Sequence, residues 1–242
     1  MKARFSQKAK LYNKSSRVQK ESAELLCKLI QSFKSDLSLA ADLGSGTGYV
    51  AEQLLELFPD LKIDCCDISQ EMLKTIQDNP NLKNCSINKS TIPPANSYSV
   101  ITSNFSMQWF TNLEFTLSEC MKKLETDGIM ALSLPVSETF DHLHKAAKMS
   151  ELDVPLPNLP SENYIKDIIK DYTCISCKCF ELSESFRNTL EFLRGVHNLG
   201  AIEQGPLTPA KDLKKLIACH DKLFDGPVKA KYKVLQVILK NV

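Results

Sequence analysis

The first half of the chain alternates short apolar runs with segments of helical periodicity. Apolar runs typical of buried strands lie at 37–41, 61–67, 84–88, 97–103 and 129–134. Apolar residues at helical spacing, or a capping residue before them, mark helices over 21–33, 50–58, 69–77 and 112–124. Strands that alternate with helices form parallel sheets covered on both faces, so this half predicts an α/β domain.

Beyond Pro135 the alternation weakens. Helices are predicted over 138–151, 161–170, 185–199 and 208–224, and strands over 172–180 and 232–239. A proline-rich linker separates the first two of these helices. We expect the last strand to be the antiparallel hairpin partner of the strand before it. The helical insertions, together with the N-terminal arm, are the expected substrate lid.

A glycine-rich turn, Asp42-Leu-Gly-Ser-Gly-Thr-Gly48, joins the first strand to the next helix. Three glycines at every second position permit unusual backbone conformations and let a ligand lie against the main chain at the helix start. A dinucleotide fingerprint has glycines at positions one, three and six, whereas these stand at one, three and five, and the phosphate loop GxxxxGK(S/T) is absent. The turn resembles motif I of class I methyltransferases, which accepts the methionine part of S-adenosylmethionine. A tight turn without a ligand is the alternative.

Asp67 ends the second predicted strand. Open α/β sheets bind ligands at the carboxyl ends of their strands, where a carboxylate can accept both hydroxyls of a ribose. The alternative is a helix-entry residue stabilised by the helix dipole.

The amino-acid composition limits the classes of function that the protein can have. Hydrophobic residues make up 43% of the chain and charged residues 24%, which indicates a compact globular protein. A net charge of +1 gives no overall electrostatic case for nucleic acid or an anionic membrane. No run of about 18 apolar residues is present and the N-terminus lacks a signal-peptide core, so we expect a cytoplasmic protein.

The nine cysteines are expected to be reduced thiols in or near the core. Cys174, Cys177 and Cys179 lack an obvious fourth ligand, so we predict no metal site. His142, His144, His197 and His220 share no ligand spacing and are interpreted as surface or structural residues.

The N-terminal segment is strongly basic. Residues 1–20 hold seven lysines and arginines and no acidic residue. A solvated arm is one interpretation, and the interspersed apolar residues allow a packed cap as the other.

Several segments together resemble the malonyl-acyl carrier protein O-methyltransferases of biotin synthesis. They are 5–12 and 18–23 at the N-terminus, 103–109 after the fourth strand, Leu193-Arg194 with Gly200-Ala201, and 232–240. The resemblance implies a Rossmann-like class I methyltransferase fold, with a seven-stranded, mostly parallel sheet flanked by helices. It also implies a single domain over 1–242, divided into an arm and helix (1–34), a cofactor-binding half (35–135), and lid helices with the hairpin strands (136–242).

The same resemblance implies S-adenosylmethionine as cofactor, with S-adenosylhomocysteine as product. The implied cofactor-binding residues are Asp42, Gly44, Gly46, Gly48, Asp67, Ile68, Asn88 and Asn104. Two positions depart from the family: Asn88 replaces an acid near the adenine, and Ser99 replaces an aspartate inside the fourth strand.

The substrate implied is the free carboxylate of malonate on acyl carrier protein, or on coenzyme A, and the methyl ester primes pimeloyl synthesis. A carboxylic acid of pKa about 4 is already ionised at neutral pH and needs no general base. Alignment alone can lower a barrier by roughly 7–11 kcal/mol. We expect Arg194 to orient the carboxylate, with Arg187 next, although a lid salt bridge is the alternative. Tyr12 either lines the methyl-transfer path or packs the cap.

Other functions stay open from sequence alone. Another small-molecule methyltransferase, for instance on a phenolic quinone precursor, would need a general base that is not evident. A ligand-binding protein without turnover is a second alternative, which Asn88 and Ser99 make conceivable. A nicotinamide dehydrogenase is disfavoured by the glycine spacing. For the leading hypothesis, the basic arm would steer an acidic carrier protein.

Overall fold

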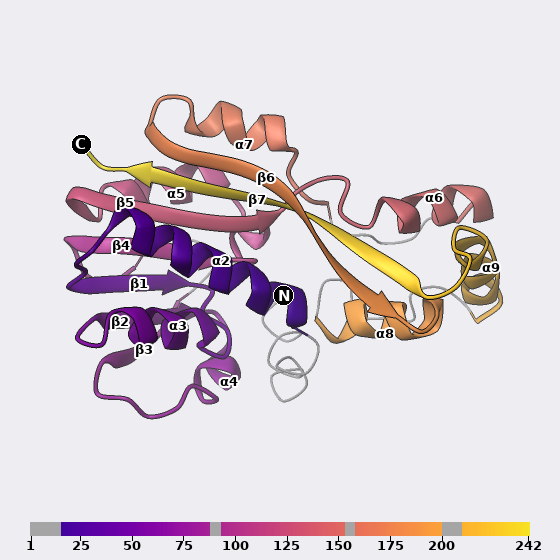
Figure 1. Ribbon diagram of the computed structural model, residues 1–242, viewed down its shortest axis with the longest axis horizontal. Helices are drawn as coiled ribbons and strands as arrows, with labels where there is room; N and C mark the ends of the chain where they lie inside the picture. Colours follow the sequence, from indigo (N-terminus) through magenta and orange to yellow (C-terminus); the bar gives the residue numbers. More distant parts are fainter. Residues whose placement is uncertain (1–15, 88–92, 153–157, 200–209) are drawn as a thin grey trace.

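One seven-stranded sheet organises the computed structural model, which describes residues 16–87, 93–152, 158–199 and 210–242 (Figure 1). The strand order is β3-β2-β1-β4-β5-β7-β6. Strands β1 to β5 pair in parallel, and β7 is antiparallel to both β5 and β6. The strands are β1 Leu39–Leu43, β2 Lys62–Asp67, β3 Leu82–Ser86, β4 Tyr98–Asn104, β5 Leu124–Pro135, β6 Thr173–Phe186 and β7 Val228–Lys240. The predicted mostly parallel α/β sheet with an antiparallel C-terminal hairpin is confirmed.

Helices cover both faces of the sheet. They are α2 Arg17–Phe33, α3 Tyr49–Leu57, α4 Gln70–Leu73, the 3-10 helix η1 Met107–Trp109, α5 Leu113–Met121, α6 Asp141–Ser150, α7 Glu162–Ile169, α8 Thr189–Asn198 and α9 Ala210–Asp221. One core cluster packs α5 and α7 against Ala41 and Leu43 of β1, and another packs α2 and α3 against Ala40. Because successive strand residues point to opposite faces, the two clusters lie on the two sides of the sheet.

Several helix boundaries follow from capping. Ser69, predicted as a cap, accepts a hydrogen bond from the amide of Met72, and Asn112 caps α5 in the same way. The predicted helix 69–77 is nevertheless only four residues long. The predicted helix 138–151 begins later, at Asp141, because Glu138 and Phe140 adopt positive φ angles of 78° and 60°.

The last two strands are longer than their apolar runs predicted. β6 continues to Phe186 and β7 begins at Val228, so the predicted helix 185–199 becomes a strand end followed by α8, with Asn188 as its cap. The polar residues of 181–186 obscured this strand, because one face of the β6–β7 ribbon is solvated. The predicted cap and first-turn proline at 208–209 lie outside the described residues, and α9 is described from Ala210.

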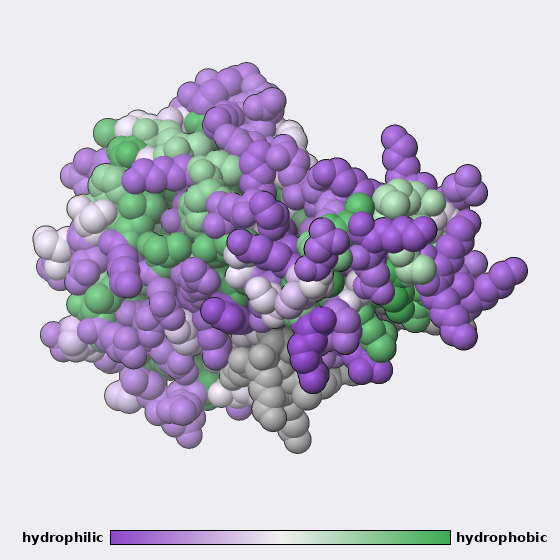
Figure 2. Space-filling view, turned by 45° about the vertical axis from the view of Figure 1, so that its right-hand side comes forward, coloured by the Kyte–Doolittle hydropathy of each residue, from purple (hydrophilic) through white to green (hydrophobic). Residues whose placement is uncertain are grey.

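The β6–β7 ribbon projects beyond the rest of the sheet, and α6, α8 and α9 gather around its far end (Figure 1). A third core cluster joins these elements, with Phe140, Phe192 and Leu216 among its buried members. Hydrophilic side chains cover much of this projecting end on the face that Figure 2 shows. That these helices form a lid stays a prediction. In the described ranges, no helix is both long and apolar enough to cross a membrane.

Candidate functional site

The glycine-rich turn follows β1 at the carboxyl edge of the parallel strands. The amides of Gly44 and Ser45 both donate to the carbonyl oxygen of Cys66, at 2.7 and 3.0 Å, which anchors the turn on the end of β2. Gly44, Gly46 and Gly48 have φ angles of 73°, 55° and 88°, a region that disfavours other residues.

Each glycine of the turn faces a different environment. A Cβ on Gly44 would lie 1.7 Å from Oγ of Ser106, and one on Gly48 would lie 3.0 Å from Cγ1 of Ile76. Among the described residues, a Cβ on Gly46 would meet nothing nearer than the carbonyl oxygen of Gly44, at 4.0 Å. Gly46 therefore borders open space that a ligand can occupy, whereas the other two glycines are required by protein neighbours.

Asp67 ends β2 and braces this turn. Its Oδ2 accepts from the amide of Gly46 at 2.9 Å, and its Oδ1 accepts from the amide of Ser69 at 2.7 Å. Burial raises the pKa of Asp67, while the backbone hydrogen bonds, one of them from Ile68, act in the opposite direction. Asp67 therefore does act at the entry to a helix, since it binds the amide of Ser69, the cap of α4. Because each carboxylate oxygen has two lone pairs, acceptor capacity remains for a ribose, and that contact stays a prediction.

Asp42 lies in β1, just before the turn, and is 1% exposed. Its Oδ1 accepts from the hydroxyl of Thr102 at 2.9 Å, whereas Oδ2 has no hydrogen-bond partner among the described residues. Burial raises the pKa of Asp42 to about 7. A buried carboxylate with a spare acceptor fits a site whose ligand carries a positive charge.

Asn104, at the end of β4, attaches α2 to the sheet. Its Oδ1 accepts from Oγ of Ser22 at 2.9 Å, and its Nδ2 donates to the backbone oxygen of Gln19 at 2.9 Å. Ser22 also lies 2.6 Å from Oγ of Ser133 in β5, and its backbone oxygen accepts from Nε2 of Gln236 in β7 at 3.2 Å. The described contacts of the Asn104 side chain are with α2, and its predicted cofactor contact is untested.

A small hollow of about 40 Å³ lies between the amino-terminal part of α2 and the turn. Its lining combines helix and turn residues with the end of β4: Ser16, Gln19, Lys20, Ala23, Gly44, Ser45, Gly46, Thr47, Tyr49, Val50 and Asn104. Sequence reasoning missed the α2 members. The available signal was Gln19 and Ser22, two polar residues within the buried stripe of an amphipathic helix.

The other predicted residues fall as follows. Arg194 is exposed on α8 and makes no ion pair within the described part of the chain, so the alternative salt bridge is not found there. Arg187 is bound to the carboxylate of Glu191, at 3.1 Å between Nη2 and Oε1. Tyr12 and Asn88 lie outside the described residues. Ser99 lies near the amino end of β4, away from the ligand edge, and its hydroxyl hydrogen-bonds the backbone of Ser38 and Leu39 at the start of β1.

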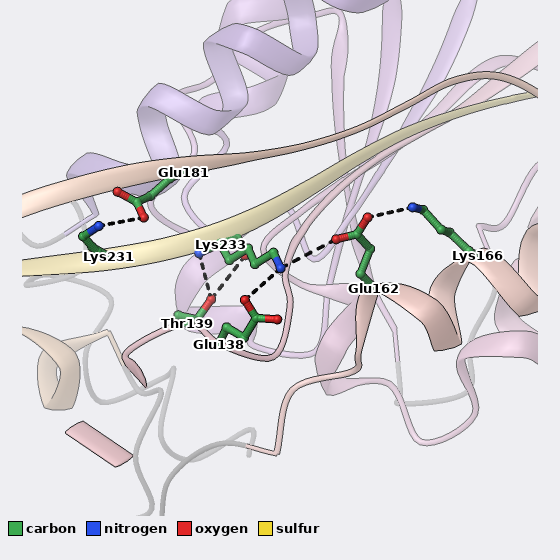
Figure 3. Close-up of polar contacts among 7 residues, drawn as sticks. All are labelled: Glu138, Thr139, Glu162, Lys166, Glu181, Lys231 and Lys233. Carbon is green, nitrogen blue, oxygen red and sulfur yellow. Dashed lines mark hydrogen bonds and ion pairs between the residues drawn. The ribbon is translucent and has the colours of Figure 1, made fainter. Parts of the chain in front are cut away.

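A larger groove of about 910 Å³ lies along the β6–β7 ribbon. Its cations are largely paired: Lys231 with Glu181 at 3.0 Å, and Lys233 with Glu138 at 2.8 Å and Glu162 at 3.8 Å (Figure 3). Lys166 also reaches Glu162, at 2.7 Å. Carboxylates that neutralise the lysines leave this groove unsuited to binding an anion by charge alone.

Two of the four histidines are structural. Nδ1 of His142 lies 2.7 Å from Nε2 of His220, which joins α6 to α9, and Nδ1 of His220 lies 2.7 Å from Oγ1 of Thr189 at the start of α8. Burial lowers the pKa of both rings to about 4. Over the described ranges, no three histidine, cysteine or acidic residues are arranged to hold a metal ion.

The sheet order, the glycine turn after β1 and the acidic residue ending β2 define a class I methyltransferase. A model of the methyltransferase domain matches residues 41–130. The chain is also 31% identical, over 92% of its own length and 89% of the relative's, to the malonyl-acyl carrier protein O-methyltransferase of Bacillus cereus. It therefore belongs to the malonyl-acyl carrier protein O-methyltransferase family.

Solved structures agree on the fold. The YcgJ protein of Bacillus subtilis superposes with a TM-score of 0.63 at 16% identity, covering 91% of this chain and 98% of that one. A geranyl diphosphate methyltransferase in complex with SAM, S-adenosylmethionine, superposes with a TM-score of 0.55 at 13% identity, covering 92% and 85%. At these identities the two structures show that the fold is shared. The S-adenosylmethionine belongs to the geranyl diphosphate methyltransferase structure.

Proposed function

We propose that this chain transfers the methyl group of S-adenosylmethionine to the free carboxylate of malonate carried as a thioester on acyl carrier protein. The observation that carries the proposal is 31% identity, across 92% of the chain, to a relative named for that reaction. The open space at Gly46 and the spare acceptors of Asp42 and Asp67 fit the proposed cofactor.

The cofactor supplies an activated methyl group on a sulfonium. The chain's own residues bind the methyl donor and align it with the malonyl carboxylate. The methionine part lies against the main chain of the turn at Gly46, where no side chain stands in the way, and Asp67 accepts from the ribose. A malonyl carboxylate is ionised at neutral pH, so no residue has to remove a proton before transfer.

Orientation of the carboxylate falls to a cation. Arg194 is the better candidate, because it is exposed and without an ion pair in the described ranges, whereas Arg187 is bound to Glu191. A guanidinium that binds one carboxylate oxygen leaves the other free to attack the methyl carbon.

Two surfaces can meet the acidic carrier protein. The first is the basic arm of residues 1–20, most of which lies outside the described residues. The second is α9, which exposes Lys211, Lys214 and Lys215 at the projecting end. Opposite charges on such surfaces accelerate encounter and lose effect as salt screens them.

The test is a transfer assay with purified protein and methyl-labelled S-adenosylmethionine. Malonyl carrier protein should become labelled as a base-labile ester, whereas acetyl carrier protein, which lacks the free carboxylate, should not. Malonyl-coenzyme A, assayed at matched ionic strength, tests whether the enzyme prefers malonate on the carrier protein. Turnover of malonyl carrier protein should fall more steeply with rising salt than turnover of malonyl-coenzyme A. Absence of labelling on any malonyl thioester would refute the proposed function.

A further inference from the structure

Three cysteines lie along the first half of β6, the edge strand of the sheet that follows α7 (Figure 1). They are Cys174, Cys177 and Cys179, and none of them is in a disulfide in the described structure. Cys174 and Cys177 are exposed, although the sequence predicted thiols in or near the core. Exposed thiols are open to oxidants, so the arrangement of these three decides what oxidation can do.

A β-bulge places Cys174 and Cys177 on the same face of the sheet. Residues three apart in a regular strand point to opposite faces. In β6 the register shifts after Cys174, which pairs with Leu239, and Ile175 is the inserted residue. Cys177 pairs with Val237, two residues from Leu239 along β7. The two cysteines therefore lie on the face that Leu239 and Val237 share, two ladder positions apart.

The two thiols are neighbours. The thiol of Cys174 donates to the backbone oxygen of Ser176 at 3.4 Å, so it points along the strand toward Cys177. Burial raises the pKa of the Cys177 thiol, and Cys174 raises it further through its charge and a side-chain hydrogen bond. Two ladder positions span about 6.6 Å, within the roughly 4.4–6.8 Å that separates the Cα atoms of a disulfide. A bond between the sulfurs thus requires side-chain rotation and no change in strand pairing.

Cys179 has a different partner. It follows Cys177 on the same face, but its thiol is hydrogen-bonded to Glu162 of α7, and burial with this bond raises the pKa of Cys179 to about 11. A thiol held protonated in this way is a poor nucleophile. Cys177 instead has the ammonium of Lys166 nearby, which favours its thiolate. The pair suited to reaction is therefore Cys174 with Cys177.

We propose that Cys174 and Cys177 form a reversible redox site, which closes to a disulfide when hydrogen peroxide oxidises it. The Cys174 thiolate attacks one peroxide oxygen, the O–O bond breaks, hydroxide leaves and the sulfur becomes a sulfenic acid. The Cys177 thiolate then attacks that sulfur and displaces a second hydroxide, which forms the S–S bond. The protons of the two thiols neutralise the two hydroxides. Two thiols and one peroxide thus give one disulfide and two waters, and a dithiol reductant reverses the change.

The pair is remote from the glycine turn. The turn follows β1, and β4, β5 and β7 lie between β1 and β6. At about 4.8 Å from strand to strand, β6 lies roughly 19 Å from β1 across the sheet. The redox site is therefore separate from the candidate methyl-transfer site, and the inference does not rest on the proposed function.

Tryptic peptide mapping tests the inference, because cleavage after Lys170 and Lys178 gives a peptide that holds Cys174 and Cys177 without Cys179. The full chain is treated with hydrogen peroxide, the remaining thiols are blocked with iodoacetamide, and the digest is measured by mass spectrometry. Peptide 171–178 should lose alkylation at both cysteines and become lighter than the reduced, unblocked peptide by two hydrogen atoms. Treatment with dithiothreitol before blocking should restore alkylation at both.

Cys174→Ser and Cys177→Ser should each abolish the lighter peptide. Cys179→Ser is the matched control from the same strand and should leave it in place. Thermal unfolding of each variant checks the fold. Full alkylation of peptide 171–178 after peroxide, or a gain of oxygen on its cysteines in place of the loss of hydrogen, would overturn the inference. A disulfide from this peptide to peptide 179–187, or to a second copy of the chain, would overturn it as well.

Discussion

Replacing Gly46 with valine is expected to weaken methyl-donor binding while the chain stays folded. The first side-chain carbon would enter open space, since its nearest neighbour in the described part of the chain is a backbone oxygen at 4.0 Å. The cost to folding comes from φ of +55°, a conformation that strains a branched residue by about 1–3 kcal/mol. In a domain of this size, such strain lowers the melting temperature by roughly 2–12 °C.

Gly44→Ala provides the contrast. A Cβ at this position would lie 1.7 Å from Oγ and 2.3 Å from Cβ of Ser106. Because the Ser106 Cβ is fixed to its backbone, rotation of the hydroxyl cannot relieve the overlap. Adding Ser106→Gly removes both atoms and leaves Cα at 3.7 Å, an ordinary contact. The double variant should regain most of the stability that Gly44→Ala loses.

The assay pairs thermal unfolding with calorimetric titration of S-adenosylhomocysteine. Overlap between the valine and the ligand, at about 1–3 kcal/mol, predicts at least a roughly fivefold and up to a 150-fold loss of affinity for Gly46→Val. Undiminished affinity in a folded Gly46→Val protein would refute the placement of the ligand on this turn. Failure of Ser106→Gly to rescue Gly44→Ala would refute the steric explanation for Gly44.

Further expectations concern the ribose contact, the substrate cation and pH. Asp67→Ala should weaken S-adenosylhomocysteine binding about tenfold or more by titration, since it removes both the predicted ribose acceptor and the brace on the turn. Arg194→Ala should raise KM for the malonyl substrate in steady-state kinetics and leave donor affinity intact, whereas normal KM would assign orientation to another cation. His142 and His220 have pKa values near 4 when folded and about 6.5 when unfolded, so the unfolded chain binds more protons between these values. The free energy of unfolding should therefore fall as pH drops from about 6.5 to 4, by at most about 1.4 kcal/mol per pH unit for each histidine. His220→Gln should flatten the dependence of the melting temperature on pH. A variant whose melting temperature depends on pH as steeply as that of the unsubstituted protein would contradict this.

The sequence predicted the parts of the fold that local pattern determines. The apolar run before Asp42 and the glycines after it specify a buried strand and a tight turn within about ten residues, and the structure confirms both. The ends of β6 and β7 were missed because their outward residues are polar, so periodicity alone did not separate a solvated ribbon from a helix.

The α2 contribution to the site was missed for a different reason. The hydrogen bonds that position it join residues 82, 111 and 214 places apart in the chain. Local pattern says nothing about such distant partners. Gln19 and Ser22 could be recognised as unusual on a buried helix face, but their neighbours became apparent only when the sheet brought β4, β5 and β7 to the same helix.

The position of β7 has a consequence for the order of folding during synthesis. Although it is formed by residues 228–240, it pairs between β5 and β6, so β6 cannot join the sheet until β7 has left the ribosome. Gln236 also carries one of the bonds that hold α2. Contacts between segments so far apart form late and slowly. Nascent chains that end before Gln236 should therefore bind the methyl donor poorly, because α2 would lack this bond and the sheet would lack β7.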